Sequence, residues 1–376
     1  MSKRNHFVKR LVIANLLVVF AMISAASRLA EASKDHKAFA ALSARLSEPG
    51  GHFDSDNLIS NETSYLHVLG KMGEIGTSGG VYLGVGPDQS FTYIAKVRPR
   101  MALMIDIRRD NLLQHLMYKA LFARARNRIE YLCLFFGKPF PGDKGWEKKT
   151  IKELADYIDE TPSDVKLFEK TSKTILQDIR KFGIMLSETD LETVAQIQKA
   201  FYTGGLDIRY SSHHRPPRNI YPTYRDLLLE RDLSGQRQNY FNSEDDFQFL
   251  KELQEKDMIV PLVGDLSGPY AVKAIGQYIK EIKEQVSVFY VSNVEFYLLR
   301  QGTFDTFIEN LKSLPIDNRS LIVRSYFNYY ASPHPQAEPN HFSTQLLQRI
   351  EDLIKDCGRG QCDYNDIVTR NSILLH

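Results

Sequence analysis

The sequence predicts an α/β protein with a doubly wound, mostly parallel sheet and a helical insertion between its second and third strands. Short apolar runs alternate with amphipathic helical segments, and each run is apolar throughout rather than at every second position. Strands buried on both faces have this continuous pattern, and alternation with helices is typical of parallel sheets covered on both sides. The interval between the second and third runs is far longer than the other intervals and contains an insertion of about 100 residues.

The composition excludes several classes of protein. The chain has 376 residues, with 48 Lys and Arg against 46 Asp and Glu, so its formal net charge is +2. A nucleic-acid-binding protein usually carries a large basic surplus, so no nucleic-acid partner is expected. Hydrophobic residues at 43% and charged residues at 25% also exclude a largely disordered chain and a multi-span membrane protein.

Residues 1–32 have the pattern of a signal peptide or an N-terminal anchor. Basic residues come first, an apolar stretch runs from Leu11 to Ala26, and Ala30-Glu31-Ala32 offers a cleavage site before Ser33. Sixteen apolar residues are short for a membrane span, which needs about 20, and suit a signal peptide. We expect an exported protein, periplasmic or extracellular. The alternative is a body tethered to the membrane by this segment uncleaved.

The exported body is expected to begin with a helical lead-in over residues 33–78. Ala38, Phe39, Leu42 and Leu46 recur at helical spacing, and a second helix is expected from about 62 to 71. The α/β domain follows over 79–136 and 243–376. Its buried strands are expected at 81–86, 101–106, 258–262 and 286–291, with a fifth beginning at 321. The helices between them are expected at 90–97, after Asp110, from Pro269 and around 304–311.

Residues 137–242 are predicted to form the helical insertion or lid. Helical stretches are expected near 147–158, 163–181 and 188–201. An unstructured loop of this length would be exceptional in a compact protein. After the fifth strand, the apolar spacing of Leu346, Leu347, Ile350, Leu353 and Ile354 predicts one helix that stops at Gly358.

Cysteine and histidine spacing suggests no metal centre. The chain contains neither a CxxC nor an HExxH motif, so no metal is expected. Cys357 and Cys362 lie five positions apart, which allows a small disulfide loop in an oxidising compartment or two unrelated thiols. Cys133 lies in an apolar helical stretch and is expected to be a core residue.

Polar residues and glycines gather where the predicted strands end. Gly84 and Gly86 end the first strand, and Asp106 ends the second. Asp265 follows the third, while Asn293 and Glu295 follow the fourth. Ligands of open parallel sheets bind outside the carboxyl ends of the strands. Glycines there admit the backbone close to a ligand, and a carboxylate can accept hydrogen bonds from both hydroxyls of a ribose.

These features resemble those of the class I S-adenosylmethionine-dependent methyltransferases, which have a Rossmann-like fold. Residues 82–88, Tyr-Leu-Gly-Val-Gly-Pro-Asp, look like their glycine-rich first motif. Tyr82 stands where that motif usually has an acid, and Asp88 replaces its third glycine. The overall order also resembles a group of bacterial proteins with this fold and an unassigned activity.

The resemblance implies a binding site for S-adenosylmethionine. It places Gly84, Gly86 and Asp88 in the cofactor loop, Asp106 on the ribose and Asp265 near the adenine. It also implies that Asn293, Glu295 and Tyr297 face the methyl acceptor, an unknown small molecule or protein. The expected reaction is methyl transfer to that acceptor, with Asn293 or Glu295 orienting or deprotonating it.

Each of these residues also has a structural explanation. The glycines could only shape a turn, and Asp265 could cap the helix that begins near Pro269. Asp106 could cap the next turn or pair with Arg108 or Arg109. Asn293 and Glu295 could be ordinary helix-start residues. The alternative function is therefore a non-catalytic ligand-binding or interaction protein on a degenerate methyltransferase-like fold. Export favours it, because S-adenosylmethionine is expected to be cytosolic.

Overall fold

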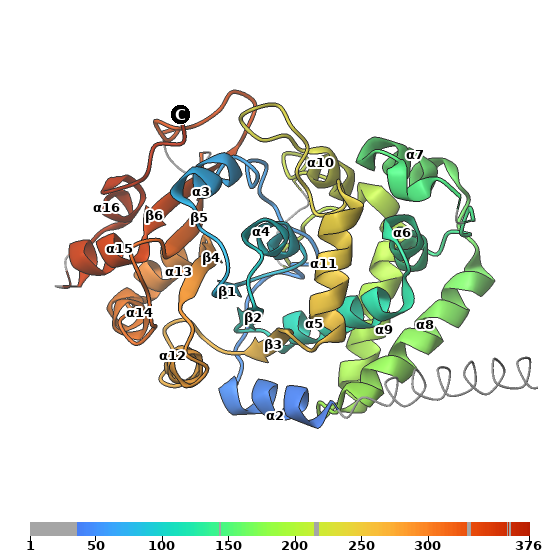
Figure 1. The fold of residues 1–376 in the computed structure, drawn as a ribbon, viewed down its shortest axis with the longest axis horizontal. Helices are drawn as coiled ribbons and strands as arrows, with labels where there is room; N and C mark the ends of the chain where they lie inside the picture. The colour runs from blue at the N-terminus through green and yellow to red at the C-terminus, as the bar shows by residue number, and fades with distance from the viewer. Residues whose placement is uncertain (1–35, 143, 214–217, 329–331, 359, 361) are drawn as a thin grey trace, which may run out of the picture. The chain divides into compact units, whose positions relative to one another are not determined.

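One sheet of six strands organises residues 39–376 (Figure 1). The structure is a computed structural model, and it describes residues 36–142, 144–213, 218–328, 332–358, 360 and 362–376. The strand order is β3-β2-β1-β4-β5-β6, with β1 to β5 parallel and β6 antiparallel to β5. The strands are β1 Val81–Gly84, β2 Met101–Asp106, β3 Ile259–Val263, β4 Val286–Ser292, β5 Leu321–Phe327 and β6 Ser343–Arg349.

The parallel strands are buried along their length, as their continuous apolar runs predict. Every residue of β1, β2, β3 and β5 is buried. Gly84 at the end of β1 pairs with Met104 in β2 and with Tyr290 in β4, and Asp106 pairs with Val263 in β3. The carboxyl ends of β1 to β4 therefore lie side by side, and the chain order reverses at β1, which lies between β2 and β4.

Helices lie on both sides of this sheet (Figure 1). Figure 1 shows α4, α5 and α11 on one side and α12, α13 and α14 on the other. Their bounds are α4 Gln89–Val97, α5 Arg109–Arg124, α11 Glu244–Glu255, α12 Ala271–Glu281, α13 Val294–Gln301 and α14 Phe304–Leu311. The prediction of an α/β protein with a mostly parallel sheet is confirmed.

Between β2 and β3 the chain is helical. In addition to α5 and α11 it forms α6 Arg128–Phe136, α7 Ile151–Glu160, α8 Val165–Ile179, α9 Glu188–Gly204 and α10 Tyr224–Leu229, with short 3-10 turns at 146–148, 180–182 and 205–207. Capping boxes at Thr150, Ser187 and Thr223 fix where α7, α9 and α10 begin. Side chains from these helices share one buried core with the sheet, so residues 39–376 form one compact unit.

The lead-in to the sheet is less helical than its sequence predicts. It contains α2 Lys37–Leu46 and α3 Leu69–Ile75, whereas the second helix was expected at 62–71. The intervening segment instead bonds to the sheet edge: the backbone N–H of Glu48 donates to Val263 (2.9 Å) and that of Gly51 to Ile107 (2.8 Å). At the start of the expected helix, the backbone N–H of Thr63 donates to the hydroxyl of Ser343 in β6 (2.8 Å), so a tertiary hydrogen bond takes the place of a helical one there.

The predicted helix over 346–354 is wrong in its first half. Residues 343–349 form β6, which pairs antiparallel with β5 in the register Leu321 to Arg349, and α15 begins only at Ile350 and ends at Cys357. The apolar spacing at 346–354 is compatible with a helix, but strand β5 needs a hydrogen-bonding partner along its edge. A final helix, α16, spans Tyr364–Thr369.

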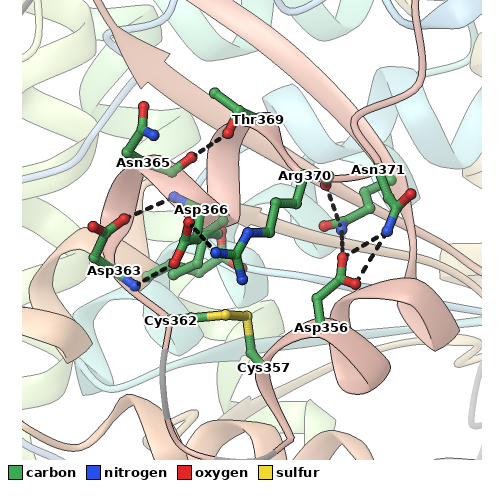
Figure 2. Close-up of a disulfide and its surroundings, with 12 residues drawn as sticks. Asp356, Cys357, Cys362, Asp363, Asn365, Asp366, Thr369, Arg370 and Asn371 are labelled. Carbon is green, nitrogen blue, oxygen red and sulfur yellow. Dashed lines mark hydrogen bonds and ion pairs between the residues drawn. A yellow bond between two sulfur atoms is a disulfide. The ribbon is translucent and has the colours of Figure 1, made fainter.

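A disulfide joins Cys357, the last residue of α15, to Cys362 (Figure 2). Asn371 donates two hydrogen bonds, of 3.1 and 2.8 Å, to the carboxylate of the neighbouring Asp356. Cys133 is a buried free thiol. Of the two alternatives that the sequence left open for Cys357 and Cys362, the structure shows the bridge, and the predicted core position of Cys133 is confirmed.

The predicted leader over residues 1–32, with its cleavage site at Ala30-Glu31-Ala32, lies outside the described residues. Within the residues that are described, none of the helices combines the length and the apolar character that crossing a membrane requires.

Candidate functional site

A pocket opens where β1 to β4 end, and five of the eight predicted site residues line it. These are Gly86, Asp106, Asp265, Asn293 and Tyr297. Apolar side chains and tyrosines form much of the remaining wall: Val85, Ile105, Leu266, Leu298, Tyr210 and Tyr290. Ligand pockets of open α/β sheets lie at this edge, at the point where the strand order reverses.

Gly86 occupies a position that suits glycine. Its φ of 77° lies in the left-handed region, which costs other residues about 1–2 kcal/mol. A Cβ added there would have only the amide nitrogen of Asn57 nearby, at 3.7 Å. The carbonyl of Gly86 accepts a 2.9 Å hydrogen bond from Nε2 of the buried His115. Burial lowers the pKa of His115 to about 4, so the ring is neutral and donates through Nε2.

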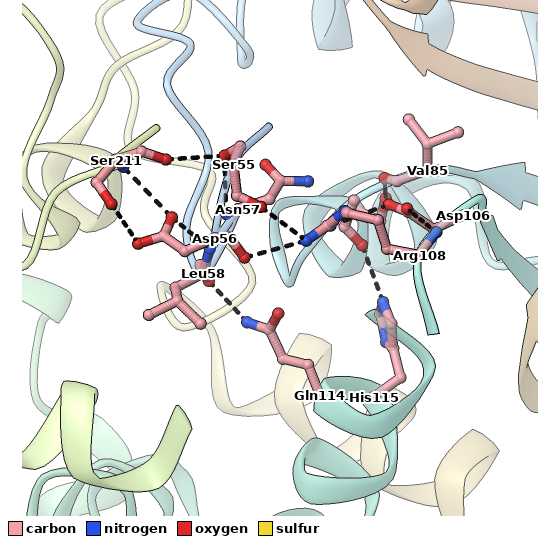
Figure 3. A network of polar contacts seen from close by, with 12 residues as sticks. Ser55, Asp56, Asn57, Leu58, Val85, Asp106, Arg108, Gln114, His115 and Ser211 are labelled. Carbon is pink, nitrogen blue, oxygen red and sulfur yellow. Dashed lines mark hydrogen bonds and ion pairs between the residues drawn. The ribbon is translucent and has the colours of Figure 1, made fainter. Parts of the chain in front are cut away.

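The carboxylate of Asp106 is held by Arg108 (Figure 3). The backbone N–H of Arg108 donates to one carboxylate oxygen (2.9 Å), and its guanidinium donates to the other (3.2 Å). The same guanidinium bonds the carbonyls of Ser55 (3.4 Å) and Asp56 (3.1 Å). Each carboxylate oxygen can accept a second hydrogen bond, so the pairing orients Asp106 and leaves acceptor capacity for a ligand hydroxyl.

Asp265 closes the turn after β3. One of its oxygens accepts from the backbone N–H (2.8 Å) and the hydroxyl (2.9 Å) of Ser267. Its second oxygen has no hydrogen-bond partner among the described residues. The N-cap position of α12 is Tyr270 rather than Asp265. Asp265 therefore shapes the pocket rim and keeps one oxygen available to a ligand.

Tyr297 lies in α13 and Asn293 directly precedes this helix; both line the pocket. Asn293 is at the N-cap position of α13, yet its side chain makes no capping hydrogen bond. Tyr297 packs edge-on against Phe53, with ring centroids 5.0 Å apart. The structural explanation of Asn293 as a simple helix cap does not apply, because its amide is left for the pocket.

Three predicted residues lie outside the pocket and have other partners. A Cβ on Gly84 would lie 2.6 Å from the Tyr82 ring, so this glycine makes room for packing. Asp88 accepts hydrogen bonds from the buried hydroxyls of Tyr224 (2.5 Å) and Tyr240 (2.9 Å). Burial raises the pKa of Asp88 to about 6.

Glu295 is the third predicted site residue that lies outside the pocket. It forms a buried ion pair with Arg324 of β5, with nitrogen-to-oxygen distances of 2.6 and 3.2 Å. Arg324 also donates to the side chain of Gln348 and to the carbonyl of Ile367. This pair ties α13 to β5 and β6, so Glu295 has a structural role.

The most conspicuous acid of the pocket is one that no sequence motif suggests. Glu62, from the segment before α3, lines the pocket and is only 1% exposed. Its carboxylate accepts from Ser292 (2.6 Å), Tyr290 (2.8 Å), Gln89 (2.8 Å) and Gln345 (3.3 Å). None of the described lysines or arginines pairs with it. Glu62 is therefore a buried acid surrounded by neutral donors, and it has no ion-pair partner among the described lysines and arginines.

The strand end that meets Glu62 has an unusual backbone. Ser292, the last residue of β4, has a φ of 52°, and the pairing of β4 with β5 shifts register between Tyr290 and Ser292. Non-glycine residues in the left-handed region cost of order 1–3 kcal/mol and persist where surrounding contacts fix them. The hydrogen bond from Ser292 to Glu62 is such a contact.

The same segment contributes further polar groups that the sequence did not indicate. Asn57 and Asn61 line the pocket beside Glu62. Across the described part of the chain, the side chains of Asn57, Asn61 and Asn293 have no hydrogen-bond partners. Unpaired amides around an apolar cavity are the groups that orient a bound ligand. In the sequence, Asn57 and Asn61 stand in a polar stretch after Pro49-Gly50-Gly51 that has neither helical nor strand periodicity, and this stretch was the one signal that pointed to them.

The fold and the pocket define an α/β protein with a cavity at the carboxyl edge of a mostly parallel sheet. Residues 58–372 match the model of the domain of unknown function DUF7790, and the chain belongs to that family. A search of curated proteins finds no match.

Proposed function

We propose that the chain binds S-adenosylmethionine in this pocket and transfers its methyl group to an unknown acceptor. The observation that carries the proposal is the convergence of Gly86, Asp106 and Asp265 at the point where the strand order reverses. The order β3-β2-β1-β4-β5-β6 supports a Rossmann-like, doubly wound sheet. Helices α6 to α10 are then an insertion between β2 and β3, and Tyr210 from this region reaches the pocket.

The residues present fit this cofactor. Asp106 would accept hydrogen bonds from the ribose hydroxyls, and the free oxygen of Asp265 lies on the side proposed for the adenine. The methionyl part of the cofactor carries an ammonium, a sulfonium and one carboxylate, so it is positive overall, and Glu62 is a buried acid that lacks a protein cation among the described residues. A buried charge gains from an opposite charge placed beside it. Glu62 could thus replace the acid that the first motif lacks at Tyr82.

Catalysis would rest on positioning. The bound cofactor supplies an electrophilic methyl carbon on its sulfonium. Asn293 would orient the acceptor through its unpaired amide, and the Phe53–Tyr297 pair would form an apolar wall that excludes water. Alignment of reacting groups in this way is a large source of rate acceleration. Glu295 is not proposed as a base, since Arg324 holds both of its carboxylate oxygens.

The second candidate is a non-catalytic ligand-binding protein on the same fold. The pairing of Asp106 with Arg108 favours it, because a ribose must share this carboxylate with a buried guanidinium. The Cys357–Cys362 bridge also supports the proposed export, since disulfides persist in oxidising compartments. In that compartment the pocket would hold a ligand other than S-adenosylmethionine.

Thermal unfolding of the purified full-length protein tests the proposal. S-adenosylmethionine and S-adenosylhomocysteine should each raise the unfolding temperature with increasing concentration, because a ligand that binds only the folded state stabilises it. Adenosine, which lacks the charged amino acid part, should have a smaller effect. Formation of S-adenosylhomocysteine with host small-molecule fractions would support methyl transfer. Stabilisation without such turnover would support binding of the cofactor and contradict methyl transfer. No stabilisation would contradict the proposed cofactor and favour the second candidate.

A further inference from the structure

Three potential metal ligands meet away from the pocket, from segments far apart in the sequence. They are His67, in the turn before α3, Glu230, at the C-cap of α10, and His341, in the loop before β6. One ligand atom from each residue lies within 4.8 Å of the other two. The sequence has no metal-ligand motif, because positions 67, 230 and 341 are brought together only by the fold.

The hydrogen bonds around His341 fix which ring nitrogen faces the cluster. Its Nδ1 lies 3.1 Å from the carbonyl oxygen of Pro339, which can only accept, so Nδ1 carries the hydrogen. Its Nε2 lies 3.4 Å from a carboxylate oxygen of Glu230. If the ring is neutral and its hydrogen is on Nδ1, the lone pair of Nε2 faces the carboxylate of Glu230, and the two repel each other. A cation between the two atoms, or a proton on Nε2, would remove that repulsion.

At this cluster, the side chain of His67 has no hydrogen-bond partner among the described residues. The residue is only 6% exposed, and its ring nitrogens make no hydrogen bond to any described residue. The ring instead meets that of His341 edge-on, with centroids 4.7 Å apart. The ring nitrogens are therefore not committed to a protein partner that coordination to a metal would have to displace.

The charge around the cluster is negative. Glu230 forms no ion pair with any described lysine or arginine, and His341 is its one ion-pair partner there. Two more acids, Asp232 and Glu338, lie close enough to act electrostatically on His67. Glu338 is contacted by His376 at 2.9 Å, and Asp232 accepts hydrogen bonds from its own loop. These carboxylates would attract a cation, whereas burial of His67 opposes positive charge on its own ring.

We propose that His67, Glu230 and His341 bind a divalent transition metal, with zinc as the expected ion. Two imidazoles and one carboxylate are ligands that zinc prefers, and water would complete the fourth position. The Nδ1 hydrogen bond from His341 to a backbone carbonyl is the outer-shell contact that ligating histidines usually make. Tetrahedral ligand bonds of about 2.0–2.1 Å place ligand atoms roughly 3.3 Å apart, so the three side chains must close in slightly.

The metal would fix two segments that build the pocket. His67 follows Glu62 by five residues, and His341 precedes Ser343 and Gln345 by two and four residues. Ser343 accepts a 2.8 Å hydrogen bond from the backbone N–H of Thr63, and Gln345 donates to Glu62. A metal joining His67 to His341 would therefore hold Glu62 in place, whatever ligand the pocket takes.

Metal titration of the full-length protein tests this proposal. The protein is stripped with a chelator and titrated calorimetrically with Zn²⁺, and Co²⁺ replaces zinc as a spectroscopic probe. We expect one Zn²⁺ per chain and the visible absorption of a four-coordinate Co²⁺ site. His67→Ala and His341→Ala should each weaken Zn²⁺ binding by more than the roughly 10- to 100-fold that losing an outer-shell partner costs. His36→Ala, which removes an imidazole outside the cluster, should leave it unchanged.

Milder variants keep the proposal testable if an alanine variant fails to fold. Glu230→Gln and His341→Gln preserve side-chain volume, and circular dichroism verifies their fold. They should lose Zn²⁺ binding and the rise in unfolding temperature that Zn²⁺ gives the wild type. Two outcomes would overturn the proposal: no heat with Zn²⁺ and an unchanged spectrum of aqueous Co²⁺, which would indicate a protonated His341 paired with Glu230, or full Zn²⁺ affinity in the folded variants.

Discussion

The hydroxyl of Ser292 donates a 2.6 Å hydrogen bond to the carboxylate of Glu62, across 230 positions of sequence. This contact joins the end of β4 to the segment before α3 and places a buried anion in the pocket wall. Under the proposed function this carboxylate would select a cationic ligand, because a buried carboxylate without a protein cation gains from an opposite charge beside it.

Glu62→Gln should weaken binding of S-adenosylmethionine. The change removes the charge and preserves the side-chain volume, so the fold should persist. Loss of a charge-assisted contact of about 1.5–3 kcal/mol corresponds to roughly a ten- to hundredfold loss of affinity. Adenosine affinity should change little. The control is Glu74→Gln, which neutralises an exposed acid that pairs with Lys71. Equal losses for adenosine and for the cofactor would refute a charge-specific role.

Asp106→Ala should also reduce affinity, by roughly ten- to hundredfold, if this carboxylate holds the ribose. Arg108→Ala separates that role from ion pairing, because it removes the partner and leaves the carboxylate. If Asp106 only anchors Arg108, the two single variants and the double variant should lose affinity equally. A double-mutant cycle measured by calorimetry decides between these cases.

Two glycines of the same motif should respond differently. Gly84→Ala places a methyl group 2.6 Å from the Tyr82 ring and should mainly lower the free energy of unfolding. Gly86→Ala should cost about 1–2 kcal/mol for its left-handed backbone and should also weaken ligand binding at the pocket wall. Gly70→Ala, in α3 with no atom within 4 Å of the new Cβ, is the control. Unchanged affinity in Gly86→Ala would separate this glycine from the site.

Asp88 should make stability depend on pH. Burial raises its pKa in the folded protein from the ordinary 3.8 to about 6, so folding favours the protonated form. This contribution is fully present below pH 3.8 and is lost as pH rises through 6. Asp88→Asn should therefore gain up to about 3 kcal/mol over the wild type between pH 4 and 8, measured by urea unfolding. A constant difference between the two proteins across that range would contradict the raised pKa.

Glu295→Gln should damage stability rather than binding. It leaves the guanidinium of Arg324, which is 1% exposed, without its anion. Breaking one side of a buried pair costs about 3–5 kcal/mol of unfolding free energy. At temperatures where the variant is folded, its affinity for S-adenosylmethionine should match that of the wild type. If the Glu295→Gln variant kept the stability of the wild type but lost methyl transfer, a catalytic role of Glu295 would be supported instead.

The sequence predicted the features that depend on local pattern and on parallel topology. Continuous apolar runs located β1 to β5, and parallel strands necessarily bring their carboxyl ends to one edge, which is why Gly86, Asp106, Asp265 and Asn293 line one pocket. It could not predict side-chain partners contributed by distant segments. Arg324 for Glu295, Tyr224 and Tyr240 for Asp88, and β5 as the partner of β6 are set by packing rather than by spacing.

Calorimetric titration of the full-length protein with S-adenosylmethionine is the most direct test of the proposed function. We predict one site per chain with a dissociation constant below millimolar. Affinity should fall roughly ten- to hundredfold in Asp106→Ala and in Glu62→Gln and stay unchanged in Glu74→Gln. No heat of binding at millimolar S-adenosylmethionine, with the protein folded, would contradict the proposal and leave the pocket to another ligand.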